Sequence, residues 1–411
     1  MAKFKKPKGK PTTIPVRGAI QKPKNRSGYR TRSATAPDRR AEALIRELAA
    51  QRVAQALQAQ REEALRNQPQ APAGNRGDGN LHIAFIQMGQ GDCAIMSTPK
   101  GRTIMFDCGS DATEMDDDDV YTRFVHDTIY GPKFLGGTNK LDYLILTHPD
   151  SDHYNRLKRV LNGDTEIYNI YHSSFLTSYS VNQVSSWIKS HTNKKFIKAV
   201  VLSEGLFSPS INLSTVQPMA DGKVIDRLDA NGAIRILQED NCIISILCSN
   251  VSTDTQKDNS NDTNRGSLVS IISAFGKKIL ICGDATRSTE DFLITKYGNN
   301  LTNLDVVQAP HHGSNVTSSD PKFVNKVKPQ MVLASAGKNV VKDHLPSKIT
   351  LDRYASVMAD NIVPNHELFY WTPGALGSYN HESSFTKKNI WVTGSNSTKT
   401  LFLNQAGFQV V

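Results

Sequence analysis

The sequence predicts an α/β fold built from two strand-rich halves, with helices packed outside two sheets. Short β-branched runs alternate with turns and helical patterns from residue 81 onward, as they do where strands and helices share one core. Hydrophobic residues make up 38% and charged residues 21% of the 411 residues, which is ordinary for a globular protein. The longest apolar runs are strand-sized, well short of the roughly 20 residues that cross a bilayer, so we expect no membrane segment.

The predicted strands are β-branched runs that end at turn residues. In the first half they lie at 81–88, 93–98, 103–108 and 142–147. In the second half they lie at 241–249, 267–275, 277–284, 305–310 and 330–336. Helical patterns lie at 181–191, 288–298 and 347–358. The last two runs, 389–393 and 400–405, have Gly-Ser-Asn-Ser between them and predict a closing hairpin.

The first 80 residues differ in composition from the body. Residues 1–36 are rich in Lys, Arg, Pro and Gly and hold few large apolar side chains, so they cannot offset the entropy of ordering and we expect them to be disordered. Residues 37–67 are dominated by Ala, Leu, Glu, Gln and Arg and predict an amphipathic helix. Residues 68–80 form a linker with Pro and Gly, and the globular body spans 81–411.

Basic charge is concentrated in the first segment. Residues 1–40 carry thirteen Lys and Arg residues and one Asp, a net charge of +12, whereas the rest of the chain sums to −2. Such an arm can neutralise phosphates and bind nucleic acid with salt-dependent affinity; a solubilising tail is the alternative. The helix at 37–67 either packs on the body or binds a protein partner. The acidic stretch at 111–119 is either a solvated loop or a segment that gates a nearby site.

Cysteine usage favours a reducing compartment. The five cysteines form no Cys-X-X-Cys pair, and three of them lie at or just past the ends of apolar runs. We therefore expect reduced, mostly buried thiols. The basic N-terminus has no apolar stretch directly after it, so we expect no secretory signal and a cytoplasmic location.

One short stretch concentrates groups that bind metals. Thr-His-Pro-Asp-Ser-Asp-His at 147–153 follows a predicted buried strand, and α/β folds place their chemistry at such strand ends. His148 and Asp150 are two residues apart, so in extended backbone they point the same way. Asp152 and His153 are adjacent and reach a second point nearby. The stretch can therefore supply two ligands to each of two metals; the alternative is a polar turn.

Further acids and imidazoles follow other predicted strands. Asp284 ends a buried run, where a carboxylate can bridge two metals. His311 and His312 follow the next strand, and His344 lies in a loop after the one beyond. Asp107 ends an early strand. Packing alone does not explain acids and imidazoles at so many strand ends.

Together these motifs form an ordered series. Besides the stretch at 147–153 it contains Gly-Gln-Gly-Asp at 89–92, Phe-Asp-Cys-Gly at 106–109, Asn-Arg-Gly-Ser-Leu-Val at 264–269, Gly-Asp at 283–284 and Pro-His-His-Gly-Ser at 310–314. In this order the motifs resemble the metallo-β-lactamase superfamily, and in particular the C-terminal domain of the ComEC competence proteins. The resemblance covers about 81–411 and implies a metallo-β-lactamase αββα sandwich with two divalent metal ions, Zn²⁺ or Mn²⁺.

The resemblance implies metal-binding roles for matching residues. His148 and Asp150 would hold one metal, and Asp152 and His153 would hold the other. Asp284 would bridge the two. His344 would complete the second set, with His311 as the alternative last ligand.

Other roles implied by the resemblance concern catalysis and support. Asp152, His311 and His312 would act in catalysis, the two histidines as a phosphate contact and a general acid. Asp92 and Asp107 would orient the metal ligands. This chain departs from the pattern in two places: Asn264 and Ser267 lie where many relatives have a further histidine ligand, and Asn155-Arg156 replaces Gly-Gly.

The resemblance implies a metal-dependent hydrolase, and the basic arm favours a phosphodiesterase or nuclease that acts on DNA. One alternative is an enzyme for a small phosphodiester or a phosphocholine-like ester, since a fold does not fix its substrate. Another is an effector component of a toxin or antiphage-defence assembly, recruited through residues 1–67.

Overall fold

The computed structural model describes residues 77–111, 119–136, 138–191, 233–251, 254–257, 260–338, 343–358 and 363–410. The chain divides into Met1–Pro69 and Gln70–Val411, and all described residues belong to the second unit. The predicted tail and helix, most of the linker and most of the acidic stretch lie outside the described residues.

The first sheet contains seven strands in the order β16-β15-β1-β2-β3-β4-β5. They are β1 (Leu81–Phe85), β2 (Ala94–Ser97), β3 (Thr103–Phe106), β4 (Lys140–Leu146), β5 (Glu166–His172), β15 (Lys399–Asn404) and β16 (Gly407–Val410). β3, β4 and β5 run parallel, and the other neighbours are antiparallel.

The second sheet also contains seven strands, in the order β14-β11-β10-β9-β8-β7-β6. They are β6 (Ile234–Glu239), β7 (Cys242–Cys248), β8 (Val269–Ala274), β9 (Lys277–Ile281), β10 (Val306–Gln308), β11 (Met331–Ala334) and β14 (Ile390–Val392). β9, β10, β11 and β14 run parallel. Each sheet is therefore mixed, with a block of parallel strands.

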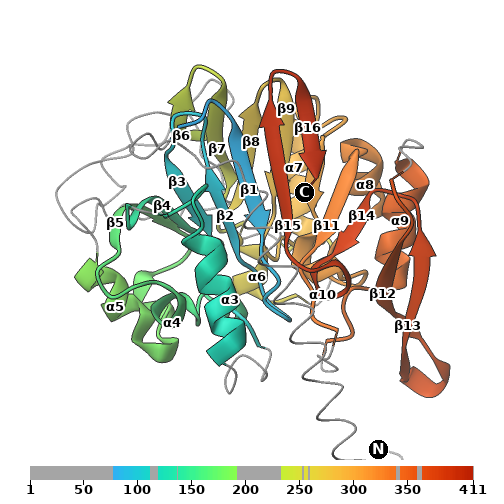
Figure 1. Cartoon of the computed structure of the whole chain (residues 1–411). Coiled ribbons are helices and arrows are strands. Elements are labelled where there is room, and N and C mark those ends of the chain that lie inside the picture. Colours follow the sequence, from blue (N-terminus) through green and yellow to red (C-terminus); the bar gives the residue numbers. More distant parts are fainter. Residues whose placement is uncertain are drawn as a thin grey trace, which may run out of the picture. The chain divides into compact units, whose positions relative to one another are not determined.

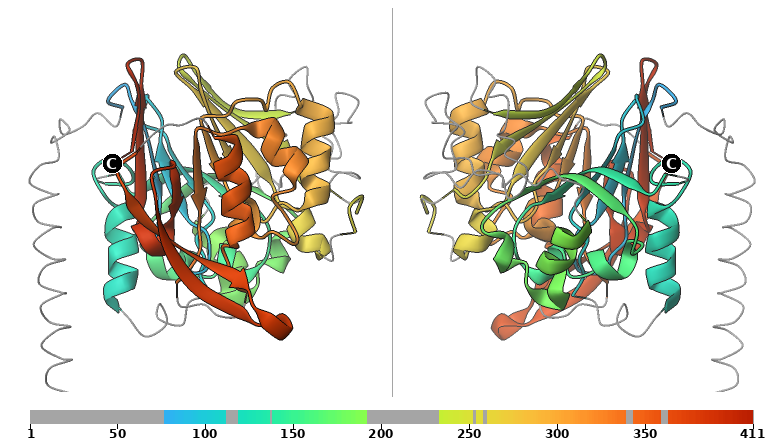
Figure 2. Two further views of the ribbon diagram at one scale, coloured as in Figure 1. Left: turned by 90° about the vertical axis from the view of Figure 1, so that its right-hand side faces the viewer. Right: turned by 90° about the vertical axis from the view of Figure 1, so that its left-hand side faces the viewer.

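The two sheets pack face to face between outer helices (Figure 2). The central core joins Ile83 and Ile104 of the first sheet to Ile244 and Ile272 of the second. Period-2 alternation sends the neighbouring residues outward, where helices cover them. Burial of one such aliphatic side chain contributes about 1.5–3 kcal/mol, so both faces of each sheet stabilise the fold. The predicted αββα sandwich is confirmed.

Different helices cover the two outer faces (Figure 1). On the first sheet they are α3 (Asp119–Ile129), α4 (Leu157–Val160) and α5 (Val184–His191). On the second they are α7 (Arg287–Tyr297), α8 (Pro321–Val327) and α9 (Lys348–Val357). The three predicted helices correspond to α5, α7 and α9. Within the described part, no helix is both long and apolar enough to span a membrane, and all five cysteines are buried free thiols.

The predicted closing hairpin is wrong. β14 pairs in parallel with β11 in the second sheet, whereas β15 pairs with β1 in the first. The short helix α10 (Thr393–Asn396) occupies the expected turn and carries the chain from one sheet to the other. Val392 is buried under the outer helices of the second sheet, whereas Leu401 and Leu403 are buried between the sheets. The two runs bury their apolar residues in different layers, so they cannot pair.

A hairpin that the sequence analysis missed lies beside the sandwich. It consists of β12 (His366–Pro373) and β13 (Tyr379–Thr386), which pair antiparallel and extend past the sheets (Figures 1 and 2). β12 buries four consecutive residues, whereas β13 is exposed along almost its whole length. β13 therefore lacks the apolar alternation by which a strand is predicted.

Candidate metal centre

The candidate site lies where parallel strands of both sheets end. The 147–153 stretch begins directly after β4, and Asp107 follows β3. In the second sheet, Asp284 follows β9, and the short helix η6 (Pro310–Gly313) follows β10. Carboxyl ends of parallel strands meet at one edge of a sheet, so the topology brings these distant motifs together.

Close packing joins the two sheets at this edge. Gly283 has φ +52°, and a Cβ built on it would lie 2.6 Å from the Cβ of Thr147. A side chain would therefore collide with the first residue of the metal-binding stretch. Glycine at 283 allows the turn before Asp284 to approach the end of β4.

Asp284 lies between two groups of possible ligands. Its Oδ2 is 3.7 Å from Nε2 of His148 and 3.4 Å from Nε2 of His311. Oδ2 of Asp150 is 3.6 Å from the same His148 nitrogen. We call His148, Asp150 and His311 the first donor set.

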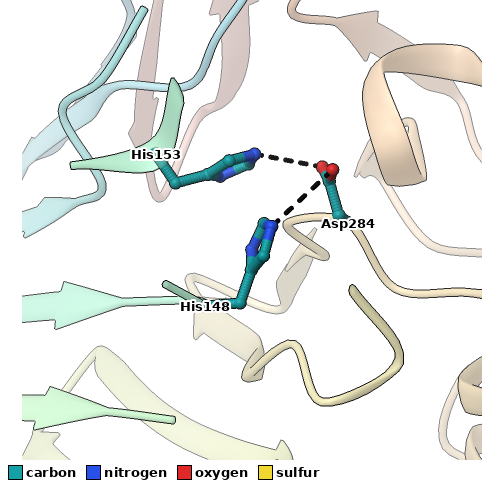
Figure 3. Close-up of side chains that lie close together, drawn as sticks. All are labelled: His148, His153 and Asp284. Atoms are coloured by element: carbon teal, nitrogen blue, oxygen red, sulfur yellow. Dashed lines mark ion pairs between the residues drawn. The ribbon is translucent and has the colours of Figure 1, made fainter. Parts of the chain in front are cut away.

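The other oxygen of Asp284 faces a second group. Its Oδ1 is 3.2 Å from Nε2 of His153 and 3.5 Å from Nε2 of His312. Oδ2 of Asp152 lies 3.2 Å from the His312 nitrogen. We call Asp152, His153 and His312 the second donor set. Figure 3 shows His148 and His153 converging on Asp284 from one side.

The chemistry of this cluster fits divalent cations. His148, His153 and Asp284 each offer a ligand atom, and these atoms lie within 4.8 Å of one another. Nε2 of both histidines and Oδ1 of Asp284 are buried and make no hydrogen bond to the described residues. Their contacts with one another are ion pairs of 3.2 Å and longer. Buried polar atoms that lack good hydrogen bonds are costly, and cations bound at these atoms would remove that cost. Mixed imidazole and carboxylate donors suit Zn²⁺ and Mn²⁺ alike.

Asp107 fixes the ring of His153. Its Oδ2 lies 2.8 Å from Nδ1 of His153, and its two oxygens also accept hydrogen bonds from the amide and hydroxyl of Thr147. When Nδ1 donates to this carboxylate, Nε2 is left for a metal. Asp92 lies farther away, with Oδ2 3.7 Å from the same Nδ1, and its amide donates to the carbonyl of Asp152.

Unusual backbone places His311 and His312. Both have positive φ, at 50° and 53°, a conformation that costs roughly 1–3 kcal/mol for a residue with a side chain. Nδ1 of His312 donates to the carbonyl of Ser335 at 2.7 Å, and Nδ1 of His311 lies 2.7 Å from Oγ1 of Thr317. These contacts leave both Nε2 atoms facing Asp284.

Charges in the cluster balance one another strongly. Burial disfavours a charged ring at His312, but Asp284 and the hydrogen bond with Asp152 outweigh burial and raise the pKa of His312 to about 10. Burial acts to raise the pKa of Asp152, yet His153 and His312 lower it to about 2. Burial lowers the pKa of His311. Without metal, protonated imidazoles therefore neutralise the carboxylates that a metal would otherwise neutralise.

His344, the expected last ligand, is not brought into this cluster. Its ring stacks on Tyr379, with centroids 4.1 Å apart and planes at 14°, and meets the edge of Trp371 at 4.9 Å. Both aromatic residues belong to the missed hairpin. We therefore replace His344 by His312 in the proposed ligand set.

Asn264 and Ser267, where this chain departs from the resembled motif, also lie at the candidate centre. Nδ2 of Asn264 lies 3.3 Å from Nε2 of His311, and Oγ of Ser267 accepts a hydrogen bond from the amide of Asp284 at 3.1 Å. His311 thus occupies the place where a further histidine ligand was missing. His311 and His312 lie beside the donors around Asp284, and the catalytic roles predicted for them stay predictions. The sequence feature that could have indicated this is the adjacent pair His311-His312, since two neighbouring imidazoles can face two different donor sets.

Competence proteins are among the known proteins to which this chain is similar. No protein-family model matches the chain. The chain is similar to ComE operon protein 3 of Bacillus subtilis (strain 168), with 24% identity over 275 residues, which cover 65% of this chain and 30% of that protein. It is also similar to competence protein ComA of Neisseria gonorrhoeae, with 42% identity over 76 residues, which cover 18% of this chain and 11% of that protein. The match therefore spans less than a third of each relative.

Matches to solved structures have low TM-scores. Human tRNase Z, short form, matches with a TM-score of 0.34 and 13% identity, covering 62% of this chain and 93% of that chain. Tm1679, a metal-dependent hydrolase of the β-lactamase superfamily, matches with a TM-score of 0.36 and 9% identity, covering 68% and 93%.

The ordered motifs and the αββα sandwich agree with the sequence matches to competence proteins. Together they confirm the resemblance of this chain to competence proteins of the ComEC type.

Proposed function

We propose that the chain is a metal-dependent phosphodiesterase that hydrolyses nucleic acid at this centre. The observation that carries the proposal is the position of Asp284, whose two carboxylate oxygens face two separate donor sets. When bound there, two divalent ions would activate a water molecule and stabilise negative charge on phosphoryl oxygens.

Exposure of the donors indicates how a substrate reaches the centre. The side chains of His148 and His153 are fully buried, whereas Asp150 is 36%, His311 19% and Asp152 15% exposed. A phosphodiester therefore approaches from the side of Asp150, Asp152 and His311. The buried histidines hold the opposite side and exclude water from it.

Two side chains control protons at the centre. Nδ1 of His153 donates to Asp107, so that proton orients the ring and does not take part in transfer. Asp152, with a pKa lowered to about 2, is ionised at neutral pH, so its carboxylate carries no proton and would be available to bind a cation. The basic arm at residues 1–40 favours a polyanionic substrate.

The test combines metal content with hydrolysis by the full chain. Purified protein is analysed for bound Zn and Mn and assayed on single-stranded DNA, RNA and bis(p-nitrophenyl) phosphate. We expect metal-dependent cleavage that Asp284→Asn and the double variant Asp152→Ala/His153→Ala lower by at least about 100-fold. His126→Ala, which removes a partly exposed imidazole beside Asp127 on α3, serves as the control and keeps full activity.

The results separate the competing functions. Cleavage of the small diester with no cleavage of DNA or RNA would favour a small-molecule phosphodiesterase. Cleavage of no substrate, or equal activity in all variants, would contradict the proposal. A role in a toxin or antiphage-defence assembly, and partner binding through residues 1–67, remain predictions.

A further inference from the structure

A hollow with a basic lining lies beside the metal-binding stretch. It has a volume of about 460 Å³, within the size range of ligand sites. Its lining consists of three basic and three amide residues: Asn155, Arg156, Lys158, Arg159, Asn182 and Gln183. Amide and basic side chains offer many N–H donors, and no carboxylate is among these lining residues.

The hollow lies close in sequence to the second donor set. Asn155 lies only two residues after His153, at most about 7 Å along the chain. The hollow forms between the start of α4 and the turn before α5, elements that pack together outside the first sheet (Figure 1). Along the chain, the hollow therefore begins within two residues of a member of the second donor set.

Hydrogen bonds build the wall of the hollow. Oδ1 of Asn155 accepts from the amide of Ser110 at 3.0 Å, and its Nδ2 donates to the carbonyl of Ser110 at 2.9 Å. Nδ2 of Asn182 donates to the carbonyl of Asn155 at 3.0 Å. Asn155 and Arg156 are the residues that replace Gly-Gly in the resembled motif, so this chain adds two polar side chains at that position.

Strained backbone lies on the opposite wall. Asn182 and Gln183 are consecutive residues with positive φ, at 53° and 58°. Neither residue is glycine, so each costs roughly 1–3 kcal/mol in this conformation. Such strain gathers at ligand clamps and active sites. Hydrogen bonds and local conformation therefore define the backbone of both walls.

We propose that this hollow binds a backbone phosphate of a polynucleotide substrate, next to the phosphate held at the metal centre. This inference rests on the proposed phosphodiesterase function and narrows its substrate class. Guanidinium, ammonium and amide groups together bind a phosphate by charge-assisted hydrogen bonds. A small diester has one phosphate and cannot occupy both places. The hollow therefore favours polynucleotides over small phosphodiesters.

The test removes two exposed charges from the lining. Lys158→Ala/Arg159→Ala changes exposed residues of α4, whereas the control Lys296→Ala/Lys322→Ala removes the same charge from exposed positions on α7 and α8, outside the other sheet. With a 20-nucleotide single strand we expect kcat/KM to fall about tenfold in the α4 variant, through KM. Activity on bis(p-nitrophenyl) phosphate stays unchanged, and the control variant matches wild type on both substrates.

A binding measurement separates this inference from the proposed function. Fluorescence anisotropy of the same oligonucleotide is recorded against salt with the full chain in chelator, where hydrolysis is absent. Loss of one phosphate contact lowers the slope of log K against log salt by about 1 in the α4 variant relative to the control. That difference in slope supports phosphate binding in the hollow even if the wild-type protein cleaves no substrate. Equal slopes and equal kcat/KM in the α4 and control variants would contradict phosphate binding in the hollow, whereas the proposed hydrolase function would stand. An equal loss on the small diester would contradict phosphate binding there too.

Discussion

Nε2 of His311 lies 3.3 Å from Nδ2 of Asn264. The sequence suggested that the metal held by His148 and Asp150 lacks a ligand near Asn264. In the structure a residue 47 positions later fills that place, because η6 follows β10 at the same sheet edge. Nε2 of the neighbouring His312 lies 3.5 Å from the other oxygen of Asp284, so one dipeptide offers a nitrogen to each donor set.

The ligand assignment predicts different effects for two histidines. His312→Ala should lose about one of the two bound ions, because its Nε2 is one of the second donor set. His344→Ala should keep both ions, because its ring stacks on Tyr379. Metal analysis of dialysed protein measures both variants. Loss of metal in His344→Ala, with full retention in His312→Ala, would reverse the assignment.

Orientation of His153 by Asp107 predicts a loss of metal affinity without loss of a ligand. Asp107→Asn should weaken metal binding about 10–100-fold, because the carboxylate that accepts from Nδ1 is gone. Titration against a chromogenic chelator gives the affinity. Asp142→Asn is the matched control, since Asp142 accepts a hydrogen bond from the amide of Thr103 elsewhere between β3 and β4. Equal affinities in the two variants would contradict the role of Asp107.

Metal binding should release protons at neutral pH. Without metal the pKa of His312 is raised from 6.5 to about 10, so the ring is protonated at pH 7, but only its neutral form binds a metal. Metal affinity should therefore rise with pH. Calorimetric titrations in two buffers of different protonation enthalpy count the protons released. Identical heats in both buffers would show that none is displaced.

The same pKa has the opposite effect on metal-free stability. A histidine whose pKa is raised by folding stabilises the protein fully below the unfolded pKa of about 6.5, and that contribution is lost as the pH rises toward 10. The melting temperature of the chelated protein should therefore fall over this window. His312→Gln should flatten that part of the pH profile.

Close contact between Gly283 and Thr147 predicts a local packing defect. Gly283→Ala should lower the free energy of unfolding by roughly 1–3 kcal/mol more than Gly276→Ala. Both glycines have positive φ, but a Cβ at 276 meets open space whereas a Cβ at 283 meets Thr147. Urea unfolding of the two variants gives the difference between their free energies of unfolding. Equal values would show that the contact with Thr147 does not destabilise Gly283→Ala.

Much of the fold and the centre follows from the sequence alone. The parallel strands have buried apolar runs, and their carboxyl ends carry Asp107, His148 and Asp284, so the shared edge could be predicted. The choice of ligands among His311, His312 and His344 could not be predicted. The positive φ of His311 and His312 sets the direction of their rings, and no residue pattern indicates that conformation. The contacts of His344 could not be predicted either, because its stacking partner Tyr379 lies on the exposed strand β13, which lacks apolar alternation.

Pairing of β1 with β15 has a consequence for the order of synthesis. A ribosome delivers β1 more than 300 residues before its partner, as the Leu81 and Leu403 pair illustrates. Until then one edge of β1 stays open, and exposed strand edges recruit other chains. The chain adds β14 to the second sheet, passes through α10, and then adds β15 to the first sheet beside β1. The edge that carries the candidate centre is therefore completed only after the late strands β14 and β15 have joined their sheets.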